Sequence, residues 1–161
     1  MPCPDEEFMS RFRWSKILPP VLLHAARAIR SRDERRDVVY EYKRRWHGEP
    51  SLPKGPIKRV VVLCFGNICR SPFAGLDLAR LNPDLEVRSA GLFAREGKPA
   101  EPGALRVATE YDIDLSAHGA HLLNAEDVAW ADLLIGMSGR HVETISERWP
   151  EARNKTRVLG D

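Results

Sequence analysis

The sequence predicts an α/β fold, in which a doubly wound parallel four-stranded sheet with flanking helices follows a helical N-terminal extension. Two observations support this prediction. From residue 57 onward, short apolar segments of strand length alternate with helical segments, which is typical of a parallel sheet. The first of these apolar segments, residues 60–63, is continuously hydrophobic, as expected for a strand that is buried on both faces.

The expected elements follow one another without an internal repeat. The expected strands are residues 60–63, 85–90, 132–137 and 156–159, and the expected helices are residues 71–81, 104–111, 126–131 and 140–149. Residues 48–56 contain two glycines and three prolines and are expected to form a linker. The chain is therefore predicted to consist of a helical extension with its linker, residues 1–56, and an α/β domain, residues 57–161.

The extension is predicted to contain two helices. The first covers residues 21–30, which are rich in alanine and leucine. The second starts at Ser31, which forms a capping-box pattern with Glu34. Three apolar side chains then recur every fourth residue, namely Val38, Tyr42 and Trp46. We expect this stripe to pack on the α/β domain. The alternative is a docking element for a partner or an acidic membrane surface, because the segment is basic and amphipathic.

Composition and charge exclude several classes of protein. The formal net charge is +2, with 14 basic and 8 acidic residues in residues 1–59. The basic excess lacks interleaved aromatic residues, so we expect no nucleic acid partner. No apolar run approaches the roughly 20 residues that cross a bilayer, and no secretory signal is recognised. Three cysteines argue against a disulfide framework and for a reducing compartment, so a cytoplasmic location is expected.

The chemistry is expected in the segment CFGNICRSP, residues 64–72. Cys64 ends the buried strand, and Arg70 with Pro72 opens the following helix. The loop between them brings backbone N–H groups to a helix N-terminus, which is a natural anion site. Gly66 allows the backbone to turn and to approach a ligand closely. A cysteine and an arginine at this spacing are weak evidence alone, but this context makes the signal strong.

The residue types in this loop suit phosphoryl transfer. A helix N-terminus and a guanidinium favour the thiolate form of Cys64, which is then a nucleophile near neutral pH. Arg70 can bind two phosphoryl oxygens at once, a geometry that lysine would not reproduce. Backbone amides and Arg70 together can stabilise the charge of the transition state. The expected product is a phosphocysteine, which water later hydrolyses. No metal or other cofactor is expected.

The segment VVVLCFGNICRSP resembles the active-site signature of the low-molecular-weight protein tyrosine phosphatases. The resemblance continues through Ser89-Ala90-Gly91, residues 116–118, residues 132–138 and residues 158–160, and covers about residues 57–161. It implies the phosphotyrosine phosphatase I-like fold and the hydrolysis of phosphotyrosine on proteins. In many bacterial relatives the substrate is a tyrosine kinase that controls polysaccharide export.

The resemblance also implies a role for each matched residue. Cys64 would be the nucleophile and Arg70 the phosphate ligand. The phosphate-binding loop would be Phe65, Gly66, Asn67, Ile68, Cys69 and Arg70. The residues that support this loop would be Asn67, Ser71, Ser89 and His118. Cys69 resembles a second loop cysteine that can pair reversibly with the nucleophile under oxidation, and its alternative is a small buried residue.

The sequence departs from the family pattern in one important place. The family's general acid is the aspartate of an Asp-Pro pair after the fourth strand, whereas this sequence ends at Asp161. We therefore expect an incomplete chain. Two alternatives stay open, a non-catalytic module that binds phosphoproteins and an arsenate reductase. The second would need further cysteines after Cys69, and there are none.

Several other residues carry weaker expectations. Phe93 and Arg95 follow the Ser-Ala-Gly turn, and we expect one of them at the rim of the site. His121 and His141 have no second ligand at metal spacing and are expected to be surface or helix-face residues. Two tryptophans at helix ends are expected to anchor the core, namely Trp130 and Trp149.

Overall fold

The computed structural model of the protein describes residues 32–47 and 51–159 of the 161-residue chain. The elements are α3 (Arg32–His47), β1 (Arg59–Cys64), α4 (Arg70–Leu81), β2 (Glu86–Gly91), α5 (Pro102–Glu110), α6 (Ala125–Trp130), β3 (Leu133–Gly136), α7 (Gly139–Arg148), a short 3₁₀ helix η2 (Pro150–Lys155) and β4 (Thr156–Val158). The predicted helix at residues 21–30 and the cap at Ser31 lie outside the described residues. No helix in the described ranges is long and apolar enough to cross a membrane.

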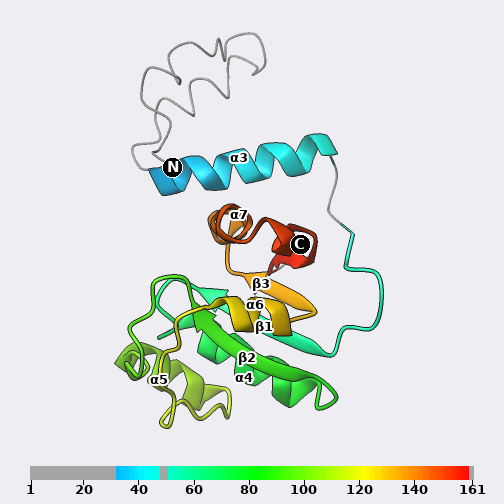
Figure 1. The fold of residues 1–161 in the computed structure, drawn as a ribbon. Helices are drawn as coiled ribbons and strands as arrows, with labels where there is room; N and C mark the ends of the chain where they lie inside the picture. The colour runs from blue at the N-terminus through cyan, green and yellow to red at the C-terminus, as the bar shows by residue number, and fades with distance from the viewer. Residues whose placement is uncertain (1–31, 48–50, 160–161) are drawn as a thin grey trace.

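The four strands form one parallel sheet in the order β2-β1-β3-β4 (Figure 1). Helix α4 covers one face of the sheet, and α6 and α7 lie on the other (Figure 1). Neighbouring residues of β1 alternate between the two faces, so that Val61 packs in one core cluster with Ile145 of α7 and Val62 packs in another with Leu78 of α4. The predicted doubly wound parallel sheet is confirmed.

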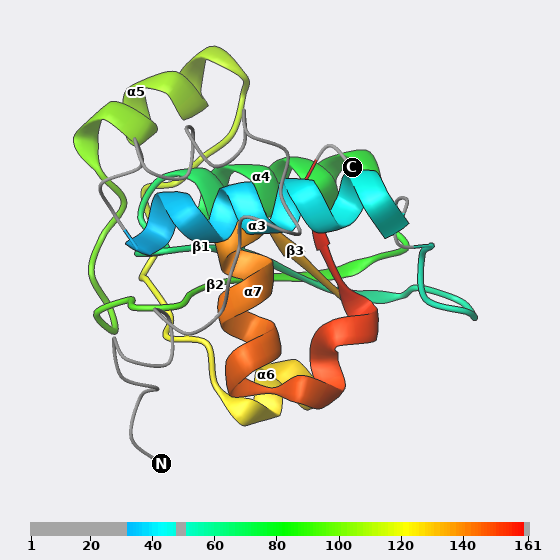
Figure 2. The same cartoon turned by 90° about the horizontal axis from the view of Figure 1, so that it is seen from above.

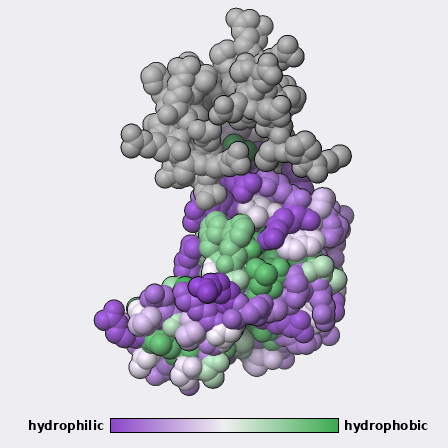
Figure 3. Space-filling model, turned by 60° about the vertical axis from the view of Figure 1, so that its left-hand side comes forward, coloured by the Kyte–Doolittle hydropathy of each residue, from purple (hydrophilic) through white to green (hydrophobic). Residues whose placement is uncertain are grey.

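The sheet order places the site. From β1 the chain first crosses to β2 at one side and later crosses to β3 at the other side of β1. The carboxyl ends of β1 and β3 therefore lie at the point where the connections diverge, which is where open α/β sheets bind ligands. The loop of residues 65–69 lies at this point, between β1 and α4. On the face at the carboxyl ends, apolar side chains gather centrally with hydrophilic ones around them (Figure 3).

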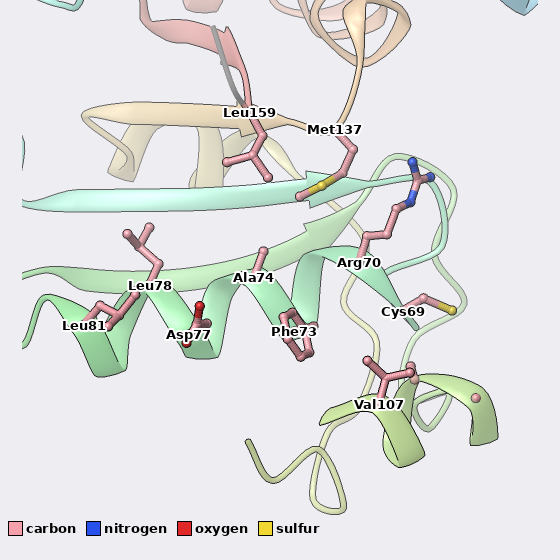
Figure 4. Close-up of a pocket in the computed structure, with 12 residues that line it drawn as sticks. Cys69, Arg70, Phe73, Ala74, Asp77, Leu78, Leu81, Val107, Met137 and Leu159 are labelled. Carbon is pink, nitrogen blue, oxygen red and sulfur yellow. The ribbon is translucent and has the colours of Figure 1, made fainter. Parts of the chain in front are cut away.

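A groove also runs along α4, on the side away from α7. Apolar side chains of α4 and α5 line it together with Met137 and Leu159, and its volume is about 670 Å³ (Figure 4). Cys69 and Arg70 lie at one end of the groove, where α4 begins, on the right in Figure 4. The groove is therefore adjacent to the predicted phosphate loop, but its lining is mostly hydrocarbon.

Helix α3 packs on the α/β domain by lying across α7 (Figure 1 and Figure 2). The predicted contact stripe is wrong at Trp46, which is 70% exposed; Val38 and Tyr42 are half-buried, and the buried side chain is Tyr40. Tyr40 lies on Gly139, where an added Cβ would come within 2.5 Å of the Cβ of Tyr40. The cause is the partner surface, since α7 presents charged side chains and a glycine here. Arg36 and Lys43 consequently join Tyr40 in the contact.

Two further expectations concern core packing. Trp130 and Trp149 are partly buried against the core cluster that contains Val61. Their predicted role as core anchors is confirmed. Helix α3 is also tied to the α/β domain by an ion pair of Arg36 with Glu147 of α7 at 2.7 Å.

Candidate active site

The loop after β1 turns its first two carbonyl groups away from its centre. The Cys64 carbonyl accepts a hydrogen bond from the Leu92 N–H at 3.0 Å, and the Phe65 carbonyl accepts one from the Phe93 N–H at 2.9 Å. Both donors belong to the segment that follows β2. The loop is therefore anchored to the neighbouring connection by its backbone, independent of side-chain identity.

The next two carbonyl groups are held in the same way from another direction. The Asn67 carbonyl lies 2.6 Å from Nε2 of His118, which must donate because the carbonyl can only accept. The Ile68 carbonyl accepts from the N–H of Glu101 at 2.9 Å, just before α5. Four carbonyl oxygens of this loop, those of Cys64, Phe65, Asn67 and Ile68, thus point away from its centre.

The N–H groups of these peptides face the opposite way. No peptide bond of the described chain is cis, and in a trans peptide the N–H points away from the carbonyl. The N–H groups of Gly66, Ile68 and Cys69 donate to no acceptor within residues 32–47 and 51–159. They converge at the N-terminus of α4, whose dipole adds positive potential. These backbone N–H groups therefore form a cradle for an anion.

Asn67 holds the loop in this shape. Its φ angle is +51°, a left-handed conformation that asparagine tolerates better than most residues. Its Nδ2 donates to Oγ of Ser71 at 2.9 Å and to Oγ of Ser89 at 3.0 Å. Its Oδ1 accepts from the His121 N–H at 2.8 Å, and the side chain is fully buried. Strands β1 and β2, α4 and the loop before α6 thus all fix one residue.

The sulfur of Cys64 lies inside this network. It accepts hydrogen bonds from the Asn67 N–H at 3.2 Å and from Oγ of Ser71 at 3.0 Å. Cys64 is 3% exposed. Two donors aimed at a sulfur atom stabilise negative charge on it, which is the state that a nucleophile requires.

Arg70 is exposed in the first turn of α4 and has no ion pair among the residues that the structure describes. Its side chain is directed toward Met137, while the Cys69 side chain leaves the same turn in another direction (Figure 4). Burial, together with the charge of Glu101, raises the pKa of the Cys69 thiol. Arg70 is thus available to an external anion, and Cys69 is held as the neutral thiol.

His141 corrects the expectation of a surface or helix-face residue, because it is completely buried. Its ring lies 4.7 Å from the ring of Phe65, and Nδ1 lies 2.8 Å from Oγ of Ser138. Burial, with the charges of Arg70 and Arg140, lowers its pKa to about 4. His141 is consequently a neutral support beneath the loop. Its position beside two apolar, buried residues of α7 was the missed signal.

His121 also acts as more than a surface residue. Its backbone N–H binds Asn67, and its Nε2 lies 2.7 Å from Oδ2 of Asp127. Burial lowers the pKa of His121, but the hydrogen bond and charge of Asp127 outweigh it, so the net shift is upward. Asp127 itself is fixed by a capping box with Asn124 at the start of α6. That Asn-x-x-Asp pattern was visible in the sequence.

Gly91 also contacts the loop, although the sequence pattern predicted no role for it there. An added Cβ would lie 2.7 Å from the Phe65 carbonyl oxygen and 2.8 Å from the Asn67 nitrogen. Only a residue without a side chain allows the phosphate loop to approach β2 so closely. Within the described ranges, no group of three or more His, Cys, Asp or Glu side chains could hold a metal ion.

Comparison with known proteins gives consistent results. The sequence model of the family described as "Low molecular weight phosphotyrosine protein phosphatase" matches residues 59–161. The low molecular weight protein-tyrosine-phosphatase Wzb of Escherichia coli K12 is 43% identical over 101 residues, which are 63% of this chain and 69% of Wzb.

Solved structures are similar as well. The tyrosine phosphatase Wzb from Escherichia coli K30 in complex with sulphate has a TM-score of 0.63 at 37% identity, over 65% of this chain and 73% of that one. The YwlE arginine phosphatase from Geobacillus stearothermophilus has a TM-score of 0.60 at 41% identity, over 65% and 67%. Helix α3 lies outside the family match.

Proposed function

Because this chain belongs to the family of low molecular weight phosphotyrosine protein phosphatases, we propose that it hydrolyses phosphotyrosine on proteins through a phosphocysteine intermediate. The observation that carries this proposal is the cradle of N–H groups around a sulfur that accepts two hydrogen bonds. Such a cradle binds a dianion and places the nucleophile beside it.

The reaction follows from this arrangement. The Cys64 thiolate attacks phosphorus, a sulfur–phosphorus bond forms, and the bond from phosphorus to the phenolic oxygen breaks. The N–H groups of the loop and the guanidinium of Arg70 bind the phosphoryl oxygens and stabilise the charge that spreads over them. Water then cleaves the phosphocysteine, which releases inorganic phosphate and restores the thiolate.

Four residues support the loop in this scheme without contacting the phosphoryl group. Ser71 donates to the sulfur, and Asn67 keeps Ser71 in place while Ser89 accepts its second N–H. His118 holds the Asn67 carbonyl outward, and so turns the Ile68 N–H inward. Their contribution is pre-organisation of the donors before substrate binds.

The location and partner follow from the same reasoning. The sequence contains three cysteines, which argues for a reducing compartment, so the proposed location is the cytoplasm. Its substrate would be a phosphotyrosine protein, and the family resemblance points to a bacterial tyrosine kinase.

Phosphoarginine is a second candidate substrate class. It is favoured by the similarity to an arginine phosphatase, which reaches 41% identity. Phosphotyrosine and phosphoarginine present the same terminal oxygens, so a cradle built from backbone N–H groups binds either. The two classes must therefore be compared directly on the purified protein.

The decisive experiment measures hydrolysis of para-nitrophenyl phosphate, a phosphotyrosine peptide and a phosphoarginine peptide in the presence of a chelator. We expect turnover of the first two, and loss of turnover in Cys64→Ser with retention of phosphate binding. Cys3→Ser is the matched control and should retain activity. Activity that survives Cys64→Ser, or that needs a metal, would overturn the mechanism, and binding without turnover in the unaltered protein would indicate a non-catalytic module.

A further inference from the structure

Two arginines of α7 lie against the aromatic side chains that border the phosphate loop. The guanidinium carbon of Arg140 is 4.4 Å from the centroid of the Phe65 ring, and that of Arg148 is 5.8 Å from the centroid of the Phe93 ring. The two rings stack on each other at 5.6 Å with an interplanar angle of 12°. Phe93 is 60% exposed and Arg148 is exposed as well, so this part of the pair faces solvent beside the cradle, whereas Phe65 and Arg140 are half-buried.

These two arginines are poorly neutralised. Arg148 donates to the Leu92 carbonyl at 3.1 Å but has no carboxylate within 4 Å among the described residues. The carboxylate oxygen paired with the Arg140 guanidinium is Oδ2 of Asp37, which lies 3.9 Å from Nε, too far for a hydrogen bond. That Nε is buried without a hydrogen-bond partner among the described residues.

Other cations at the contact between α3 and α7 behave differently. Arg36 is paired with Glu147 at 2.7 Å, and Lys43 with Glu143 at 3.0 Å. The uncompensated positive charge on this side of α7 is therefore concentrated at its two ends, next to the site. When a bound phosphate group neutralises Arg70, Arg140 and Arg148 still attract further negative charge.

Helix α3 fixes one of the two arginines. Oδ1 of Asp37 accepts the backbone N–H of Arg140 at 2.7 Å, in the first turn of α7. Tyr40 lies on Gly139, the residue before Arg140. Arg140 is thus held at its backbone by a helix that lies outside the family match, while its guanidinium makes no hydrogen bond to the described residues of that helix.

We propose that Arg140 and Arg148 form a cationic rim that selects phosphopeptides with carboxylates next to the phosphorylated residue, and that Asp37 of α3 positions Arg140 for this role. The proposal rests on the proposed function and names its substrate class. The two arginines are eight residues apart on one helix, about 12 Å along its axis. An extended peptide covers that length with about four residues, so both cations can reach side chains flanking one phosphotyrosine.

The test compares three phosphotyrosine peptides that differ only in flanking residues, which are aspartate, alanine or lysine. The readout is the ratio of kcat/KM for the aspartate peptide to that for the lysine peptide. We expect this ratio to exceed one in the unaltered protein and to fall about tenfold in Arg140→Gln, and less in Arg148→Gln, since exposed charge pairs are individually modest. Arg140→Lys should recover part of the ratio. High salt should lower it in the unaltered protein.

Arg80→Gln is the matched control, because Arg80 pairs with Asp77 on α4 and its loss changes the net charge equally. Asp37→Ala should lower the ratio, whereas Asp37→Asn, which keeps an oxygen for the Arg140 N–H, should retain most of it. An equal ratio in Arg140→Gln and Arg80→Gln would overturn the proposal.

The experiment also separates this proposal from the proposed function. Turnover of para-nitrophenyl phosphate reports on the phosphatase chemistry without any flanking residue. If the unaltered protein fails to hydrolyse it, the function is wrong, and the rim is then tested by binding of the same three peptides to Cys64→Ser. Tighter binding of the aspartate peptide would support the proposed cationic rim, and equal binding of all three peptides would contradict it.

Discussion

The phosphate loop and helix α3 are built by opposite means. The loop is held by hydrogen bonds between buried, mostly uncharged groups, with Asn67 at the centre. Helix α3 is attached to α7 largely through exposed or half-exposed charges, such as the pairs Arg36–Glu147 and Lys43–Glu143. Buried hydrogen bonds define one geometry and resist salt, whereas surface ion pairs contribute little each and weaken with ionic strength. The phosphate loop should therefore keep its geometry at high salt, whereas the attachment of α3 to α7 should weaken.

Asn67→Ala is the variant that we expect to have the largest effect, and it tests whether the hydrogen bonds of Asn67 determine the shape of the loop. The change leaves the buried donors and acceptors of Ser71, Ser89 and the His121 N–H unsatisfied and places alanine at a positive φ angle. We expect kcat/KM on para-nitrophenyl phosphate to fall about 100-fold, because small displacements of positioning groups have effects of this size. Asn82→Ala, which removes an exposed hydrogen bond to Leu78, is the control and should leave kcat/KM unchanged. Near-normal kcat/KM in Asn67→Ala would show that the backbone alone shapes the loop.

The pH dependence of stability should report on His141. Its pKa is about 4 in the folded protein and 6.5 as the ordinary value. As pH falls, His141 therefore takes up a proton in the unfolded chain before it does so in the folded protein. The part of the unfolding free energy that depends on neutral His141 is fully present above pH 6.5 and is lost as pH falls toward 4. This loss of unfolding free energy is about 3 kcal/mol at most. Urea unfolding of the native protein and of His141→Gln across this range measures it, and parallel pH profiles for the two proteins would contradict it.

A smaller effect is expected from Gly91→Ala. The new Cβ would collide with the Phe65 carbonyl oxygen and the Asn67 nitrogen, so the loop or β2 must move. We expect a loss of about 2 kcal/mol in unfolding free energy together with reduced turnover. Gly103→Ala is the matched control, because nothing lies within 4 Å of its Cβ position in α5 and alanine favours the helix. Equal stability of the two variants would mean that the loop tolerates a wider spacing from β2.

The smallest effect concerns the ion pairs of α3. Lys43→Ala should lower the unfolding free energy by less than about 1 kcal/mol, since Lys43 is 44% exposed. Hydrogen exchange at 1 M salt should accelerate in α3 but not in the amides of the phosphate loop. Equal acceleration in both regions would show that they are coupled after all.

The amino-acid pattern was enough to predict the sheet, the strand that ends at Cys64 and the short range from Cys64 to Arg70 that contains the chemistry. These features depend on contacts within a few residues or on the alternation of apolar segments, which a linear pattern records. Within that range, however, the left-handed turn lies at Asn67 and not at Gly66, where the sequence predicted the turn, because the φ angle of Gly66 is not positive.

The groups from distant parts of the chain that complete the site could be identified only from the folded protein. His121, His141 and Gly91 joined it through contacts with the loop that no local pattern could rank. The face of α3 that is buried depends on α7, because the glycine and the charged side chains of α7 accommodate Tyr40 and leave Trp46 exposed. The physical reason is the same in each case: burial and pairing of a side chain depend on the surface it meets, and that surface is brought there by the fold.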